Sequence, residues 1–159
     1  MTVNDSDHLI ELLAETHSRT LALLKGIDLE MQVYEDGSWQ IRDILGHIAT
    51  WDRQVALSLR AFNQGSEHFI PDFDEATFNN EDVKRQSILT SQQLFEEWEA
   101  AREVFKDAVR EVPRDLYPGD LLYPWGDERG TLANLVREMC EHDQKHYNEI
   151  AKAINSLES

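Results

Sequence analysis

The chain has 159 residues, a length that suits one domain able to bury its own core. Its 15 basic and 31 acidic side chains give a formal net charge of −16. Because an anionic surface of this size repels phosphate backbones and anionic lipid headgroups, the composition argues against nucleic-acid binding and against a role at membrane surfaces.

The single cysteine, Cys140, excludes an internal disulfide, as expected of a protein in the reducing cytosol. No apolar run of about 18 residues is present to span a bilayer. The N-terminal sequence MTVNDSDH lacks the basic and apolar regions of a signal peptide. From these features we expect a soluble, cytoplasmic protein.

Apolar and small side chains recur at steps of three and four from Leu9 to Ile27. This spacing predicts a first helix over about residues 6–27. His8 and His17 fall on polar positions of that helix, so we expect both side chains to be solvated.

A second apolar stripe runs from Ile41 to about Asn63, and Ser38 stands where it can cap the corresponding helix. His47 lies at the edge of the stripe, with Asp43 one turn before it. An imidazole at this position can point along the core boundary toward a ligand. A hydrogen-bonded, partly buried histidine would give the same pattern.

Residues 64–80 mix glycine, proline, acidic and aromatic residues, which predicts a connection with at most a turn or two of helix. Residues 81–87 fit a short helix. Thr90 and Gln93 then form a capping-box pattern that begins a third long helix, and Pro113 ends it.

Residues 113–130 hold three prolines and three glycines and show no sustained periodicity, as in a long loop. Tyr117, Tyr123 and Trp125 could line a pocket there or pack over the end of the helices. Thr131 is placed to cap the last helix.

The last helix, from Thr131 to about Leu157, carries histidines on its apolar face. The stripe consists of Leu132, Leu135, Met139, His142, His146, Ile150, Ala153 and Leu157. The two histidines are one turn apart, with Cβ atoms about 6 Å from each other, and at this spacing two imidazoles can bind one metal ion.

An unpaired polar ring in a core costs about 1–3 kcal/mol. His142 and His146 are therefore either metal ligands or hydrogen-bonded core histidines. A third ligand would decide between these readings, and His47 is the only other histidine near the core face of a long helix.

Four long amphipathic helices, without an alternating strand pattern or an internal repeat, predict an all-α bundle that forms one domain over residues 1–159. The sequence contains no nucleotide-binding loop and no GxSxG or HExxH motif.

Residues 39–52, WQIRDILGHIATWD, together with HDQKHYNEI at 142–150, resemble the DinB-like (YfiT-type) metalloenzyme superfamily. In that family a tryptophan opens the second helix, a histidine follows in the same helix, and the last helix carries HxxxH. The resemblance implies that His47, His142 and His146 are the ligands of a metal ion.

The resemblance also implies a four-helix bundle in up-down-down-up order, with a long crossover between helices 2 and 3 that residues 64–80 accommodate. Three imidazoles with an open fourth position suit a divalent metal ion, and we expect zinc or nickel. Such an ion lowers the pKa of bound water or activates a thiolate.

Members of the superfamily include thiol-dependent transferases, a maleylpyruvate isomerase and hydrolase-like proteins. The first functional hypothesis is therefore a metal-dependent transferase or hydrolase that acts on a small-molecule substrate, with a low-molecular-weight thiol as a candidate cosubstrate. The second is a bundle that binds a metal or small ligand without turnover. The third is a structural bundle that forms a homodimer through helix faces.

Several neighbours of the three histidines have expected roles. Asp43 and Asp143 could accept the second N–H of a ligating imidazole, as such rings usually require. Gln54 faces the same side as His47 and is a candidate to contact a substrate. Glu138 and Tyr147 are expected to be ordinary residues of the last helix. Cys140 is expected to be a buried, inert thiol, with metal ligation as a minor alternative.

Overall fold

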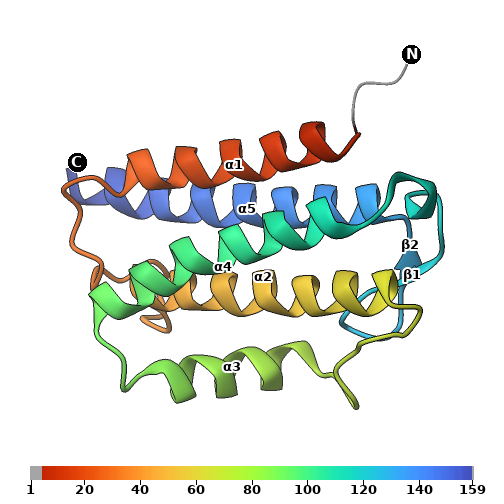
Figure 1. Cartoon of the computed structure of the whole chain (residues 1–159). Helices are drawn as coiled ribbons and strands as arrows, with labels where there is room; N and C mark the ends of the chain where they lie inside the picture. The colour runs from red at the N-terminus through yellow and green to blue at the C-terminus, as the bar shows by residue number, and fades with distance from the viewer. Residues whose placement is uncertain (1–4, 159) are drawn as a thin grey trace.

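The computed structural model describes residues 5–158 and consists of long helices with a small hairpin at one end (Figure 1). The helices are α1 (Asp5–Leu23), α2 (Ile41–Asn63), α3 (Glu75–Gln86), α4 (Ser91–Glu111) and α5 (Leu132–Glu158). A 3₁₀ turn (Arg114–Leu116) precedes two antiparallel strands, β1 (Leu121–Leu122) and β2 (Arg129–Gly130). Within the described residues, none of the helices has the length and apolar character needed to cross a membrane.

The four long helices form a bundle in up-down-down-up order, as predicted (Figure 1). Helices α1 and α5 run in one direction, and α2 and α4 run in the other. Because α2 and α4 are parallel neighbours, the chain must return along the length of the bundle between them. Helix α3 lies on this return path and packs against α2.

The sequence placed the start of α3 too late. Its first residue is Glu75, inside the segment predicted to be mainly loop, and Asp74 caps it by accepting a hydrogen bond from the Thr77 backbone N–H at 3.0 Å. Among the residues of α3 only Asp82 is fully buried. A helix that is polar on nearly every side gives no apolar periodicity, which explains the missed start.

The predicted cap of α2 is also wrong. The backbone N–H of Ser38 donates to Asp36 Oδ1 at 2.9 Å in a turn, and the helix begins after Gln40. The backbone N–H of Gln40 donates to Asp43 Oδ2 at 2.9 Å, so Asp43 stabilises the start of α2.

Caps of the other two helices agree with the sequence. Thr90 Oγ1 accepts from the backbone N–H of Gln93 at 3.0 Å, and Gln93 Oε1 accepts from that of Thr90 at 2.8 Å. Thr131 Oγ1 accepts from the backbone N–H of Asn134 at 3.1 Å. These contacts fix where α4 and α5 begin.

One predicted helix end differs from the structure, and one residue predicted to lie on a buried stripe is exposed. Helix α1 stops at Leu23, four residues early, and the chain leaves it through Gly26, whose φ of 75° is a left-handed conformation that suits glycine. Near the end of α5, Leu157 is 70% exposed, and Ile154 is the last residue of that helix to pack in the core.

A buried polar layer crosses the bundle between two apolar clusters. On α5 the buried apolar residues up to Met139 belong to one cluster, and those from Ile150 onward belong to the other. The fully buried polar residues between them, here called the polar layer, come from α2, α4 and α5: His47, Asp52, Arg102, Asp143 and His146. Such a layer is costly unless its members are paired or bind something.

Candidate metal centre

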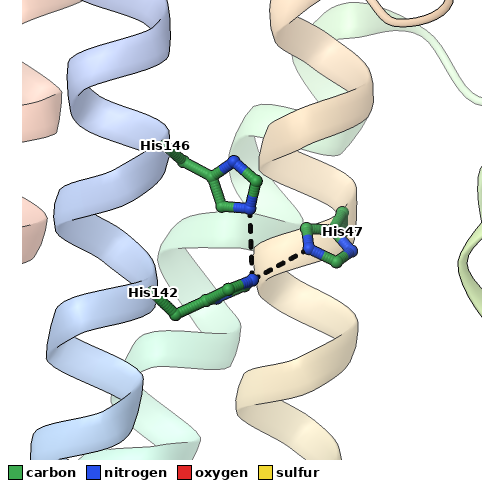
Figure 2. Close-up of side chains that lie close together, drawn as sticks. All are labelled: His47, His142 and His146. Carbon is green, nitrogen blue, oxygen red and sulfur yellow. Dashed lines mark hydrogen bonds between the residues drawn. The ribbon is translucent and has the colours of Figure 1, made fainter. Parts of the chain in front are cut away.

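The three histidines named from the sequence meet at one point, His47 and His146 within the polar layer and the half-buried His142 beside them (Figure 2). His47 comes from α2, and His142 and His146 come from α5. His142 Nε2 lies 3.0 Å from His47 Nε2 and 3.1 Å from His146 Nε2. One ring nitrogen of each residue lies within 4.8 Å of the other two, a separation that allows all three to bind a single ion.

All three imidazoles are neutral at pH 7. Burial, together with repulsion by the neighbouring rings, lowers the pKa of His47 to about 2. Burial and the nearby His146 ring lower the pKa of His142 to about 3. Burial also lowers the pKa of His146, although Glu149 opposes the shift. Each ring therefore offers one lone pair, the form in which histidine binds metals.

Glu149 sets the tautomer of His146. Its Oε1 lies 2.7 Å from His146 Nδ1, so that nitrogen carries the proton and donates, and the lone pair is left on Nε2 facing the other rings. The same oxygen accepts a hydrogen bond from the Tyr34 hydroxyl at 2.8 Å. A carboxylate that orients a ring in this way is typical of metal-ligating histidines.

The hydrogen bonding of the cluster fits a cation at its centre. His142 Nε2 has two neighbouring nitrogens, but a neutral ring has only one proton or one lone pair there and cannot pair well with both. An ion would accept all three lone pairs, and a tetrahedral zinc with Zn–N bonds of about 2.0–2.1 Å places its ligand nitrogens about 3.3 Å apart. Two of the three separations, 3.0 and 3.1 Å, are close to that value, and the third is at most 4.8 Å.

A cavity of about 380 Å³ opens beside the cluster. Its lining comes from α2, α3, the segment after β1, and α5: His47, Trp51, Phe73, Glu75, Asn79, Trp125, Asp127, Glu128, Glu138, Met139 and His142. The Nδ1 atoms of His47 and His142 are buried without a hydrogen-bond partner among residues 5–158. Since both rings line the cavity, a bound water or ligand can satisfy them.

The aromatic residues of the 113–130 loop have different positions. Trp125 lines the cavity beside Trp51, with ring centroids 6.1 Å apart. Tyr123 is buried, and its ring centroid lies 5.5 Å from that of Trp125. Tyr117 is buried in the apolar cluster and does not reach the cavity. Both readings of this loop thus hold, each for part of it.

The two aspartates expected to orient the ligand rings have other partners. Asp43 caps α2, as described above. Asp143 accepts hydrogen bonds from Arg102 at 2.7 Å and from the Thr16 hydroxyl at 2.7 Å. Arg102 also donates to both oxygens of Asp52, at 2.9 and 3.0 Å. Arg102 thus joins two buried carboxylates, and Glu149 takes the role predicted for the aspartates.

Three other polar predictions were wrong. Gln54 Oε1 lies 2.7 Å from His68 Nε2 and outside the cavity lining. His17 is not solvated, because its ring stacks on that of Trp98, with ring centroids 3.8 Å apart. Glu138 is not an ordinary helix residue, because it lines the cavity.

The remaining predictions for single residues agree with the structure. His8 is exposed. Cys140 is half-buried, and burial raises the pKa of its thiol to about 11, as in an inert packing residue. The Arg19 guanidinium lies over the Tyr147 ring, with Arg19 Cζ 4.9 Å from the ring centroid.

Some lining residues gave a usable sequence signal and others did not. Glu138 precedes His142 by one helical turn, so the helix period could have placed it on the same face. Glu75 and Asn79 lie on α3, whose first residues were predicted as loop. This helix has no apolar periodicity from which the face that packs against α2 could be predicted. Asp127 and Glu128 follow β1 in irregular structure, where spacing carries little information.

Solved structures show the same fold. The mycothiol-dependent maleylpyruvate isomerase superposes with a TM-score of 0.74 and 17% identity over 91% of this chain. A mutant of that isomerase gives a TM-score of 0.75, also with 17% identity over 91% of this chain. In both comparisons the chain spans 60% of the isomerase.

YfiT from Bacillus subtilis, described as a probable metal-dependent hydrolase with an unusual four-helix bundle topology, superposes with a TM-score of 0.76 and 16% identity. That superposition covers 99% of this chain and 90% of YfiT. No curated protein matches the chain significantly. The sequence model of the DinB superfamily matches residues 12–150, a range that includes all three clustered histidines, and the chain therefore belongs to the DinB superfamily.

Proposed function

We propose that the protein is a metal-dependent enzyme that acts on a small molecule, with His47, His142 and His146 as the protein ligands of a divalent ion. The observation that carries the proposal is the convergence of three neutral imidazoles beside an open cavity of about 380 Å³. Three protein ligands leave a coordination position for water or substrate, as in catalytic zinc sites.

When bound, the ion would supply Lewis acidity, through which it polarises a substrate or lowers the pKa of a water or thiol. The residues of the chain do the rest. Glu149 holds His146 with its lone pair toward the ion. Trp51 and Trp125 form an aromatic part of the cavity wall, with ring centroids 6.1 Å apart.

We propose two alternative reaction types for this site, a thiol-dependent transfer and a hydrolysis; a mycothiol-dependent isomerase and a protein described as a probable metal-dependent hydrolase share its fold. We propose zinc or nickel as the ion, because an all-nitrogen ligand set suits both. The cavity lies inside a single bundle, so a homodimer is not needed to complete it.

Elemental analysis of purified protein tests the metal, with one equivalent per chain expected. Cobalt exchanged into the site then reports on thiols, because a thiolate that binds cobalt gives a strong charge-transfer absorption. A new band at millimolar thiol supports the transferase reaction. An unchanged spectrum with turnover in an ester or amide hydrolysis screen supports the hydrolase. Protein that carries no metal after loading with zinc, nickel or cobalt would overturn the proposal.

A further inference from the structure

The cavity beside the three histidines carries negative charge that the protein does not neutralise. Four carboxylates are among its lining residues: Glu75, Asp127, Glu128 and Glu138. None of the residues that line it is lysine or arginine. Within residues 5–158 none of the four carboxylates forms an ion pair, although many acidic side chains elsewhere in the bundle do.

Two of these carboxylates are held in place close to each other. Glu128 Oε1 accepts the indole N–H of Trp125 at 2.9 Å, and Glu138 Oε2 accepts from the Asn134 amide at 3.3 Å. Both side chains are half-buried. Burial and the neighbouring charge of Glu128 raise the pKa of Glu138, and a cation between or above the two carboxylates would offset this repulsion.

The rest of the wall is aromatic. The Trp51 and Trp125 ring centroids lie 6.1 Å apart, and Phe73 meets Trp51 edge to face at 5.5 Å. Trp51 is fixed by a hydrogen bond from its indole N–H to Asn79 Oδ1 at 3.1 Å. Rigid indole faces next to carboxylates attract organic cations more strongly than neutral or anionic groups.

A separate observation points to ligand binding in this cavity. His47 is 4% exposed and is one of the lining residues, and its Nδ1 has no hydrogen-bond partner among the described residues. A buried polar nitrogen of this kind needs a partner, and the cavity is the space from which one can come.

We infer that the cavity selects a small organic cation, a substrate with an alkylammonium group that lies against Trp51 and Trp125 with Glu128 and Glu138 as its counterions. The inference rests on the proposed function, in which the metal on the three histidines acts on the other end of the same molecule. Substrates with a carboxylate in this position are excluded by repulsion. A volume of about 380 Å³ restricts the ligand to a small molecule.

Three probes of similar size and different charge test the inference. Choline is the cation, 3,3-dimethyl-1-butanol is its neutral isostere with the same hydroxyl group, and 3,3-dimethylbutanoate is the anion. Isothermal titration calorimetry on zinc-loaded protein should give a choline dissociation constant at least about tenfold lower than that of the neutral alcohol. The anion is compared on chelator-treated protein, where no metal can bind its carboxylate, and there it should bind more weakly than either. Equal affinities for choline and its isostere would overturn the inference.

Variants that replace a single carboxylate by its neutral amide test whether Glu128 and Glu138 cause the preference for choline. Glu128→Gln and Glu138→Gln should each weaken choline binding about threefold to tenfold and leave the neutral alcohol unchanged, with circular dichroism as the check of folding. Glu11→Gln is the matched control, because Glu11 is exposed on α1 and outside the cavity lining. A loss in Glu11→Gln equal to that in Glu138→Gln would assign the preference to net charge and contradict the inference.

Titration of chelator-treated protein separates this inference from the proposed function. The choline preference should persist without metal, because it comes from carboxylates and aromatic rings. A preference found in protein that cannot bind metal would support the cation cavity while the metal proposal fails. Stoichiometric metal without a choline preference, or a preference that disappears with the metal, would overturn the cation cavity and leave the metal proposal standing.

Discussion

His47 Nε2 on α2 and His142 Nε2 on α5 lie 3.0 Å apart across two helices that run in opposite directions (Figures 1 and 2). The contact lies at the level of the polar layer, between the two apolar clusters. An ion bound here would therefore link α2 to α5 at a level where polar side chains separate those clusters.

The first prediction is that His47→Ala, His142→Ala and His146→Ala each lose stoichiometric metal. Each change leaves two nitrogen ligands, too few to hold a divalent ion tightly in water. The bundle should stay folded, because the two apolar clusters remain intact. Elemental analysis, with thermal melts before and after chelation, measures both effects.

His8→Ala serves as the control for this series, since His8 is an exposed histidine of α1. It should keep one equivalent of metal and the same increase in melting temperature on metal loading. Full metal in His47→Ala would show that His47 is not a ligand and that the HxxxH pair on α5 holds the ion without α2.

The bundle and the positions of the three histidines could be predicted because they depend on periodic signals. An apolar stripe at helical spacing fixes which face of α2 and α5 is buried, and His47, His142 and His146 lie on or beside those stripes. The relative height of the two helices, which brings the rings within hydrogen-bond distance, depends on connections that no local pattern encodes.

Polar partners could not be predicted because they come from distant parts of the chain. Asp143 was a reasonable candidate to orient a ring, but Arg102 on α4 lies opposite it and takes its oxygens. Glu149, three residues after His146 on α5, accepts the hydrogen bond from His146 Nδ1. Many surface pairs on helices have the same spacing, so the spacing does not identify this one. Only the packed structure distinguishes these cases.

The second prediction concerns Glu149. Glu149→Gln removes the charge that fixes the proton on His146 Nδ1, and we expect metal affinity to fall about tenfold to a hundredfold while the fold is retained. Competition with a chromophoric chelator measures the affinity. Tyr34→Phe is the control, because it removes the other hydrogen bond to Glu149 and leaves the carboxylate itself; an equal loss there would attribute the effect to the Tyr34 contact.

The third prediction concerns the pH dependence of the metal-free protein. In the folded state the pKa values of His47 and His142 are about 2 and 3, and that of His146 is lowered, whereas unfolded histidines titrate near 6.5. As pH falls below 6.5 the unfolded chain takes up protons that the folded cluster does not. The free energy of unfolding should therefore fall, by up to about 1.4 kcal/mol per pH unit for each histidine.

Urea unfolding of metal-free protein at pH 7.5 and pH 5.0 measures this slope. His47→Leu removes one of the three groups and should show a shallower loss of stability over the same interval. Comparison with the variant is needed because the carboxylates of the chain also titrate toward the acidic end. Identical slopes for wild type and His47→Leu would mean that His47 titrates normally in the folded protein.

The last prediction concerns Arg102, which is 1% exposed and donates to Asp52 and Asp143. Arg102→Met keeps much of the side-chain volume but leaves two buried carboxylates facing each other without a counterion. Removing one partner of a buried ion pair typically costs about 3–5 kcal/mol of folding stability. Because Asp143 follows His142 directly on α5, its displacement should also weaken metal binding.

Arg53→Met is the matched control, because Arg53 forms a partly exposed ion pair with Glu97 at 2.9 Å. Surface pairs of that kind contribute about 0–1 kcal/mol, so this variant should unfold close to wild type. Adding Asp52→Asn to Arg102→Met should recover part of the loss, since one buried negative charge is then gone. Urea unfolding of the two single variants and the double variant measures these free energies. If Arg102→Met were as stable as Arg53→Met, the carboxylates of Asp52 and Asp143 would already be protonated or hydrated in the folded bundle.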